Sequence, residues 1–320
     1  MNRIYLLLLA VPLLANMPAL AVSRVERGNL TFDNIPEAPA DLAEKLDGYL
    51  NARQATPLGW SPQGQLLIAT RFGDVDQLHL VDQAGGARRQ LTFLHEPIAE
   101  AAFSPDPARN AYVYLKDVGG NENTQLYYQR LGEPAAKLLT DGKSMNGAPR
   151  WSNSGREVAF FSTARDGRSY DIDIVDPETG TLPHLALAGD SSGAAWSVLD
   201  WSPDDSKLLV LKAVSSDEGY LYVVDLNSGQ KREVDPAAAK VGIAGAKFTR
   251  DGQGVYFISD RDGEFARLRY MNLYTNEKTV ISGHIPWDIE ELAISRDGHY
   301  LAYVSNEAGA GKLNLLDLRT

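Results

Sequence analysis

The sequence predicts an all-β protein, a β-propeller of four-stranded blades with one short N-terminal helix. The first observation is a short motif, an aromatic or aliphatic residue followed by Ser or Thr and a turn. It occurs six times, as Trp60-Ser61-Pro62, Phe103-Ser104-Pro105, Trp151-Ser152-Asn153, Trp201-Ser202-Pro203, Phe248-Thr249-Arg250 and Ile294-Ser295-Arg296. Successive copies start 43 to 50 residues apart, which is close to the length of one propeller blade. Because repeats are added around one axis, the chain of 320 residues fits a single repeat domain.

The second observation is the pattern inside each repeat. Residues 66–70, 157–162 and 207–211 are short, mostly apolar runs bounded by turn residues. Their length and bounds favour buried strands over helices. A polar turn, an alternating strand and a Gly-containing hairpin follow, as at residues 170–180 and 220–229. The Asp-Gly and Asp-Asp turns after the repeated motif are predicted to be structural, because Asp caps its own backbone in turns.

The first 21 residues have the form of a cleavable export signal. Arg3 gives a short positive start, residues 4–15 are apolar, and residues 19–21 read Ala-Leu-Ala. The apolar stretch is shorter than the roughly 20 residues of a membrane span; an uncleaved anchor is the alternative. We expect an exported protein, periplasmic or secreted, that leaves the membrane after cleavage.

Residues 22–59 form a second part, and the propeller is expected over residues 60–320. Leu42, Leu46, Tyr49 and Leu50 recur at helical spacing after Pro39, which predicts an amphipathic surface helix. Residues 28–33 alternate like a strand, and such a strand could complete a blade begun at the other end of the chain.

Six blades are visible, and we expect a seventh. That blade would need strands from the N-terminal segment or from sequence beyond Thr320. A soluble propeller avoids open strand edges, so we expect the native polypeptide to continue past Thr320.

Composition excludes several functions. Apolar residues are 44% and charged residues 23%, ordinary values for a globular protein. The net charge of −11 argues against a nucleic-acid surface. The absence of Cys removes disulfides, thiol catalysis and cysteine-ligated zinc.

No catalytic constellation is evident. Gly189-Asp190-Ser191-Ser192-Gly193 matches a serine nucleophile elbow, but it leaves no room for the helix that should follow, so we interpret it as a loop between blades. The five histidines form no HExxH motif. We therefore expect no catalytic residue, no metal and no cofactor in this chain. The Arg-Asp-Gly sequences at 165–167 and 261–263 indicate repeated turn chemistry.

The best binding candidates lie in a loop of the second repeat. Asn121, Glu122 and Asn123 belong to a Gly- and Asn-rich stretch that is longer than the matching turns of other repeats. Glu122 could project toward a ligand; a solvated hairpin loop is the alternative. Arg71, just after a predicted strand, is a further candidate.

The repeats resemble those shared by TolB and by the prolyl oligopeptidase family of serine peptidases. Exported members of that family are similar in a particular series of segments: GNLTFDNIP at 28–36, RFG at 71–73, QLTF at 90–93, GGNEN at 119–123 and LTDG at 139–142. The resemblance covers residues 24 to 320.

The resemblance implies a propeller that caps a following α/β-hydrolase domain and admits short peptides. The Ser-Asp-His triad of the family belongs to that following domain, so this chain carries none of it. In some relatives, carboxylates of the propeller bind the free amine of the peptide, and Glu122 is a possible counterpart.

Three functions remain open. The first is the non-catalytic propeller portion of a prolyl-oligopeptidase-like serine peptidase, with short peptides and a C-terminal hydrolase domain as partners. The second is a stand-alone TolB-like periplasmic propeller that binds other proteins; TolB itself should carry an additional N-terminal α/β domain, for which residues 22–59 are too few. The third is a propeller enzyme such as a glycosidase or lactonase, which would need converging carboxylates or metal ligands on the inner strands.

Overall fold

The computed structural model of the protein describes residues 23–50, 53–237 and 239–319. The expected export signal, residues 1–21, lies outside the described residues. The chain divides into two compact units, Met1–Ala52 and Arg53–Thr320. Among the described residues, no helix has the length and apolar character needed to cross a membrane.

The first unit contains a hairpin and the predicted helix. Strands β1 (Arg24–Arg27) and β2 (Leu30–Asp33) pair with each other, and α1 spans Ala40–Leu50. The suggestion that residues 28–33 complete the last blade is wrong, because β2 pairs with β1 instead. Two residues connect the two strands and Gly28 has a φ of 60°, so a local hairpin forms without closing a long loop. The helix confirms the prediction made from the spacing of its leucines, and it lies at the surface, because none of its residues is buried.

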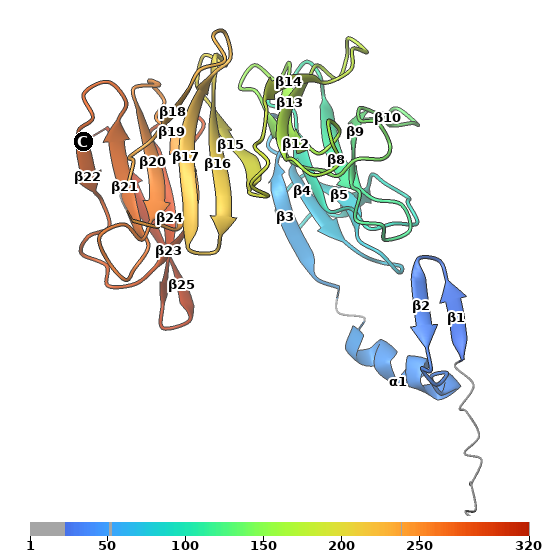
Figure 1. The fold of residues 1–320 in the computed structure, drawn as a ribbon. Coiled ribbons are helices and arrows are strands. Elements are labelled where there is room, and N and C mark those ends of the chain that lie inside the picture. The colour runs from blue at the N-terminus through green and yellow to red at the C-terminus, as the bar shows by residue number, and fades with distance from the viewer. Residues whose placement is uncertain (1–22, 51–52, 238, 320) are drawn as a thin grey trace, which may run out of the picture. The chain divides into compact units, whose positions relative to one another are not determined.

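The second unit is a propeller of six consecutive antiparallel sheets, as the repeats predicted (Figure 1). The innermost strands are β3 (Ala55–Trp60), β7 (Glu100–Phe103), β11 (Asn146–Trp151), β15 (Ala195–Trp201), β19 (Ile243–Phe248) and β23 (Ile289–Ile294). The second strands are β4 (Leu66–Thr70), β8 (Ala111–Lys116), β12 (Val158–Ser162), β16 (Lys207–Ser215), β20 (Gly254–Ser259) and β24 (Tyr300–Glu307).

The third strands are β5 (Gln77–Val81), β9 (Gln125–Arg130), β13 (Asp171–Val175), β17 (Glu218–Asp225), β21 (Arg267–Asn272) and β25 (Ala310–Asp317). Short outer strands complete the first five blades: β6 (Arg88–Gln90), β10 (Lys137–Leu138), β14 (His184–Leu187), β18 (Lys231–Glu233) and β22 (Lys278–Val280). Among the described residues the sixth blade has three strands, and a seventh blade is not formed.

The core lies between neighbouring blades. One cluster, for example, joins Leu115 and Leu126 of the second blade to Val158 and Phe160 of the third. Each of these side chains is at most 1% exposed. Because the second strands of the first five blades are covered on both faces, their sequences are nearly continuous apolar runs, whereas the third strands alternate.

The repeated motif forms the turn between the first and second strands of a blade. The Ser202 hydroxyl accepts the backbone N–H of Lys207 at 2.9 Å, and the Thr249 hydroxyl accepts that of Gly254 at 2.9 Å. The hydroxyl thereby supplies a partner for a backbone donor at the start of the returning strand. The Asp residues of the turns also accept backbone N–H groups, as Asp204 does from Ser206 and Asp251 from Gln253, which agrees with their predicted structural role.

Candidate functional site

The inner strands and the turns that follow them surround a cavity of about 1020 Å³. All six blades contribute to its lining, from Trp60 in the first blade to Arg296 in the sixth. Each inner strand packs against that of the next blade, from β3 to β23. The cavity therefore lies at the axis of the propeller, at the end of the blades where the repeated turns gather.

Three neighbouring blades place a charged side chain in this lining, at the position just before the repeated aromatic residue. These residues are Arg150, Asp200 and Lys247. The aromatic side chains that follow pack between blades: Trp201, for example, is 3% exposed. Since successive side chains of a strand point to opposite faces, the residue before the aromatic lies on the other face of its blade, where it lines the cavity.

Asp200 joins the fourth blade to the fifth. Its carboxylate accepts a hydrogen bond from the Lys247 ammonium at 3.0 Å and one from the backbone N–H of Phe248 at 2.9 Å. A carboxylate with both a charged and a backbone donor is firmly oriented. The pair thus forms one fixed wall of the cavity.

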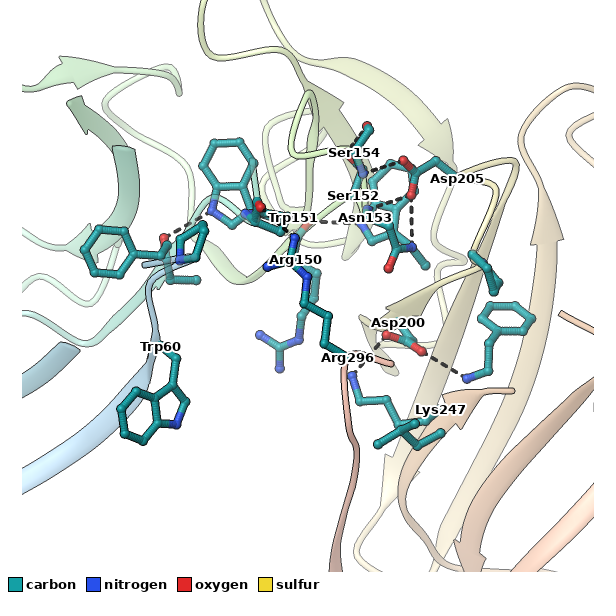
Figure 2. A pocket seen from close by; sticks show the side chains of 18 of the residues that line it. Trp60, Arg150, Trp151, Ser152, Asn153, Ser154, Asp200, Asp205, Lys247 and Arg296 are labelled. Carbon is teal, nitrogen blue, oxygen red and sulfur yellow. Dashed lines mark hydrogen bonds and ion pairs between the residues drawn. The ribbon is translucent and has the colours of Figure 1, made fainter. Parts of the chain in front are cut away.

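Two arginines of the lining, Arg150 and Arg296, are less constrained than this pair; both are labelled in Figure 2. Arg150 donates to its neighbouring Pro149 carbonyl at 2.9 Å and lies 3.9 Å from the Glu100 carboxylate. Its side chain is 42% exposed. Arg296 of the sixth blade donates to the Pro105 carbonyl of the second blade at 3.1 Å. Both guanidinium groups therefore keep donors that a ligand could use.

The turns around the cavity are interlocked. The Asp205 carboxylate accepts the backbone N–H groups of Asn153 and Ser154 at 2.6 and 2.8 Å, and Figure 2 shows this contact between the third and fourth blades. Hydrogen bonds, first from the Ser202 hydroxyl and then from Ser206, lower the pKa of the neighbouring Asp204 to about 2. Asp204 is thus bound within its own turn, and Asp205 binds the turn of the neighbouring blade.

Two tryptophans tie inner strands together. The Trp151 indole N–H donates to the Ala102 carbonyl at 3.1 Å, and the Trp201 indole N–H donates to the Arg150 carbonyl at 3.0 Å. Each acceptor belongs to the residue just before the aromatic of the preceding blade. Trp60 differs, because 68% of it is exposed.

The lining is balanced in charge although the protein is acidic. Its acids are Glu100, Asp200, Asp204 and Asp205, and its bases are Arg150, Lys247, Arg250 and Arg296. A ligand with groups of both signs matches such a lining better than a polyanion does. Among the described residues, no three His, Asp or Glu side chains gather as metal ligands would.

The residues predicted from the sequence lie elsewhere. Asn121, Glu122 and Asn123 form the loop between β8 and β9, and Arg71 follows β4. In an antiparallel blade, these loops lie at the end opposite the turns that line the cavity. The structure therefore brings Arg71 and the 121–123 loop to the same face, in neighbouring blades, but none of the four residues lines the cavity.

The loop itself is well ordered by local bonds. Asp117 accepts the backbone N–H of Glu122 at 3.0 Å, and the Asn121 side chain accepts that of Asn123 at 3.0 Å. Glu122 has a φ of 61°, in the left-handed region, and its side chain is exposed. A ligand role for these residues stays a prediction.

The charged residues that line the cavity were not predicted from the sequence. The signal was present: the residue before each repeated aromatic is Arg150, Asp200 or Lys247 in three consecutive copies. The blade repeat would have shown that these charged side chains share one position on consecutive inner strands. Arg296 had no such signal, because its contact with Pro105 joins residues 191 positions apart.

The elbow-like sequence lies in the connection from β14 to β15, between blades. Asp190 within it receives hydrogen bonds from Lys212 at 2.5 Å and from Ser192, and these lower its pKa to about 2. The Arg-Asp-Gly sequences also act in turns: Arg165 binds the Asp171 carboxylate at 2.7 Å, and Arg261 binds the Asp235 carbonyl at 2.7 Å.

Three curated proteins are similar in sequence. The chain is 27% identical to the uncharacterised peptidase YuxL of Bacillus subtilis, over 65% of this chain and 29% of that protein. It is 26% identical to dipeptidyl-peptidase 5 of Porphyromonas gingivalis, over 43% of this chain and 21% of the peptidase. It is 31% identical to the Tol-Pal system protein TolB of Alcanivorax borkumensis, over 28% of this chain and 20% of TolB. The matched region thus spans less than a third of each relative. No family model matches the chain.

Solved structures show the same fold. A prolyl endopeptidase superposes with a TM-score of 0.67 at 12% identity, over 82% of this chain and 41% of the peptidase. TolB of Acinetobacter baumannii superposes with a TM-score of 0.53 at 16% identity, over 89% of this chain and 70% of TolB. The propeller is therefore of a type found in both prolyl endopeptidases and TolB proteins.

Proposed function

We propose that this chain is the non-catalytic propeller portion of a prolyl-oligopeptidase-like serine peptidase, which controls the access of short peptides to a C-terminal α/β-hydrolase domain. The observation that carries the proposal is the axial cavity of about 1020 Å³ with its mixed-charge lining. The matches to YuxL and dipeptidyl-peptidase 5 support it.

The lining suits a peptide. A short peptide carries an amine, a carboxylate and many amide groups. Arg150 and Arg296 offer donors to carboxylates and carbonyls, while the half-exposed Glu100 accepts from amines and N–H groups. The pair of Asp200 and Lys247 is satisfied internally and keeps the wall rigid. A folded protein would be too large for a passage of this size, so the channel acts by size as well as by charge.

The peptide's free amine is a second point of recognition in this proposal. Glu122 is exposed on the face opposite the cavity turns, and Arg71 belongs to the neighbouring blade on the same face. A carboxylate there would pair with an ammonium group. Under this proposal, the loop face lies toward the hydrolase domain.

A stand-alone binding propeller is the second candidate. The TolB match of 31% identity favours it, although that match covers 28% of this chain. In this case the faces of the propeller would bind other proteins, and no hydrolase activity would accompany the chain.

We also propose that the protein is exported, on the basis of the signal-like residues 1–21. The expected location is the periplasm or the medium. Amino-terminal sequencing of the purified protein from its native host tests this proposal. A mature start at or near Val22 supports export, and a retained Met1 contradicts it.

The main proposal is tested with protein produced from the complete gene. A fluorophosphonate probe should label a serine outside residues 1–320, and the labelled protein should lose its hydrolysis of short peptides. Residues 1–320 produced alone should remain unlabelled. Absence of labelling and of peptide hydrolysis in the complete protein would contradict the peptidase proposal and favour the binding propeller.

A further inference from the structure

The repeated motif forms a β-turn, and the residue at the second position of this turn differs between the blades. The turn closes when the backbone N–H of its fourth residue donates to the carbonyl of its first, as from Gly252 to Thr249 at 2.9 Å. Proline is favoured at the second position, because its φ is already set for the turn. In chain order the second positions are Pro62, Pro105, Asn153, Pro203, Arg250 and Arg296. The turn itself therefore does not require the two arginines.

Both arginines line the axial cavity, and they belong to neighbouring blades. The stem of Arg250 is packed under the turn of the sixth blade. A Cβ on Gly298 of that turn would meet Cβ and Cγ of Arg250 at 2.5 and 2.6 Å. This close contact leaves the start of the Arg250 side chain little freedom, so the fold positions its guanidinium group at the cavity.

The guanidinium groups of the lining have more donors than acceptors. Within the described part of the chain, Arg250 makes no hydrogen bond or ion pair through its side chain. Arg296 makes one hydrogen bond, to the Pro105 carbonyl at 3.1 Å. Arg150 adds a third guanidinium group, on a side chain that is 42% exposed. Since each guanidinium carries five N–H donors, most donors of this set are left for a ligand.

The carboxylates of the same two turns do not use these donors. Asp251 accepts the Thr249 hydroxyl at 2.6 Å, and Asp297 accepts the Ser295 hydroxyl at 2.6 Å. Each of the two also accepts a backbone N–H of its own turn. Lys247 is a different case, because the Asp200 carboxylate already binds its ammonium group. The unmatched groups of this lining are therefore guanidinium groups, and an acceptor with negative charge would complete them.

We infer that Arg250 and Arg296, together with Arg150, form a carboxylate-binding site in the axial cavity, and that a short peptide supplies the carboxylate. The planar guanidinium fork matches a carboxylate with two parallel hydrogen bonds. The net charge of the chain is −11, so a local set of cations is needed to attract an anionic group to it. The peptide as the source of the carboxylate rests on the proposed function, whereas the carboxylate site does not.

Calorimetric titration of the protein from the complete gene tests this inference. The probe is a short peptide with N-methylated peptide bonds that resist hydrolysis, made as the free acid and as the C-terminal amide. We expect the free acid to bind at least about tenfold more tightly than the amide, because a hydrogen-bonded charge pair is lost in the amide. Arg250→Gln and Arg296→Gln should each weaken binding of the free acid about tenfold and leave binding of the amide unchanged.

Arg156→Gln is the matched control. Arg156 is an exposed arginine of the turn between β11 and β12, and it does not line the cavity. Its replacement should change neither affinity. The urea midpoint of each variant is compared with that of the wild type. Arg296→Gln carries the test if Arg250→Gln loses stability, because Arg296 makes a single exposed hydrogen bond.

A third peptide, an amide with one Glu side chain, identifies the source of the carboxylate. Tight binding of this peptide that is lost in both arginine variants would support the site and assign it to side-chain carboxylates. Equal affinity of the wild type for all three peptides would overturn the inference, as would equal weakening of acid and amide in the arginine variants. These outcomes concern binding alone, whereas failure of the proposed function would be seen as the absence of hydrolysis of ordinary peptides.

Discussion

The replacement of Trp201 by Phe measures how much the contact between the third and fourth blades contributes to the free energy of unfolding. The indole N–H donates to the Arg150 carbonyl at 3.0 Å, and the side chain is 3% exposed. Loss of a hydrogen bond of this kind costs about 1 kcal/mol. The smaller ring leaves part of its site empty, which adds about 1 kcal/mol. We therefore expect Trp201→Phe to lower the free energy of unfolding by about 2 kcal/mol.

Urea denaturation followed by circular dichroism is the assay, because fluorescence changes with the number of tryptophans. Trp60→Phe is the matched control in the 320-residue chain: Trp60 is 68% exposed, and its replacement should change stability by less than about 0.5 kcal/mol. A midpoint shift without a change of slope identifies a stability effect. Equal shifts for the two variants would refute the account of the blade interfaces.

Three further predictions concern a turn, a candidate binding residue and acid stability. Gly155→Ala should destabilise the chain by about 3 kcal/mol in urea unfolding. The φ of 69° costs a residue with a Cβ about 1 kcal/mol, and the contact of that Cβ with Ser104 adds about 2 kcal/mol of overpacking. Gly193→Ala, with a φ of 80° and open space, should cost only about 1 kcal/mol, and equal costs for the two variants would contradict the close packing at Gly155. Glu122→Gln in the complete protein should raise KM about tenfold for peptides with a free amine but not for acetylated ones; an equal rise for both would exclude amine recognition. The pKa of Asp204 is lowered from 3.8 to about 2, so its ionised form stabilises the fold above pH 4, and this contribution is lost as the pH falls toward 2. The difference in urea midpoint between wild type and Asp204→Asn should therefore shrink over that interval, and a constant difference would contradict the assignment.

The blades were predictable because their signals are local. The motif at Trp201 and Ser202 encodes a turn within seven residues, and the buried second strand follows directly. The pairing of β2 was not predictable in the same way. The alternation of residues 28–33 identifies a strand, but a strand edge pairs with any available partner, and the short turn at Gly28 makes β1 the nearest one.

The candidate site was less predictable than the fold. The cavity depends on how six separate inner strands come together around one axis, and that is a property of the whole propeller rather than of any one repeat. Glu122 and Arg71 were chosen for unusual local sequence, which identifies exposed loops but not the cavity. Arg150 and Lys247 were overlooked because charged residues inside a strand resemble ordinary surface positions until the axis is known.

The most direct test of the account compares two substrates for the protein from its complete gene. One is a short peptide, and the other is the same peptide sequence placed within a folded protein and exposed on a surface loop. We expect the short peptide to be hydrolysed and the embedded one to be hydrolysed at least about 100-fold more slowly. That factor corresponds to an activation free energy that is higher by about 3 kcal/mol for the embedded peptide. Equal rates for the two substrates would contradict a propeller that selects by size.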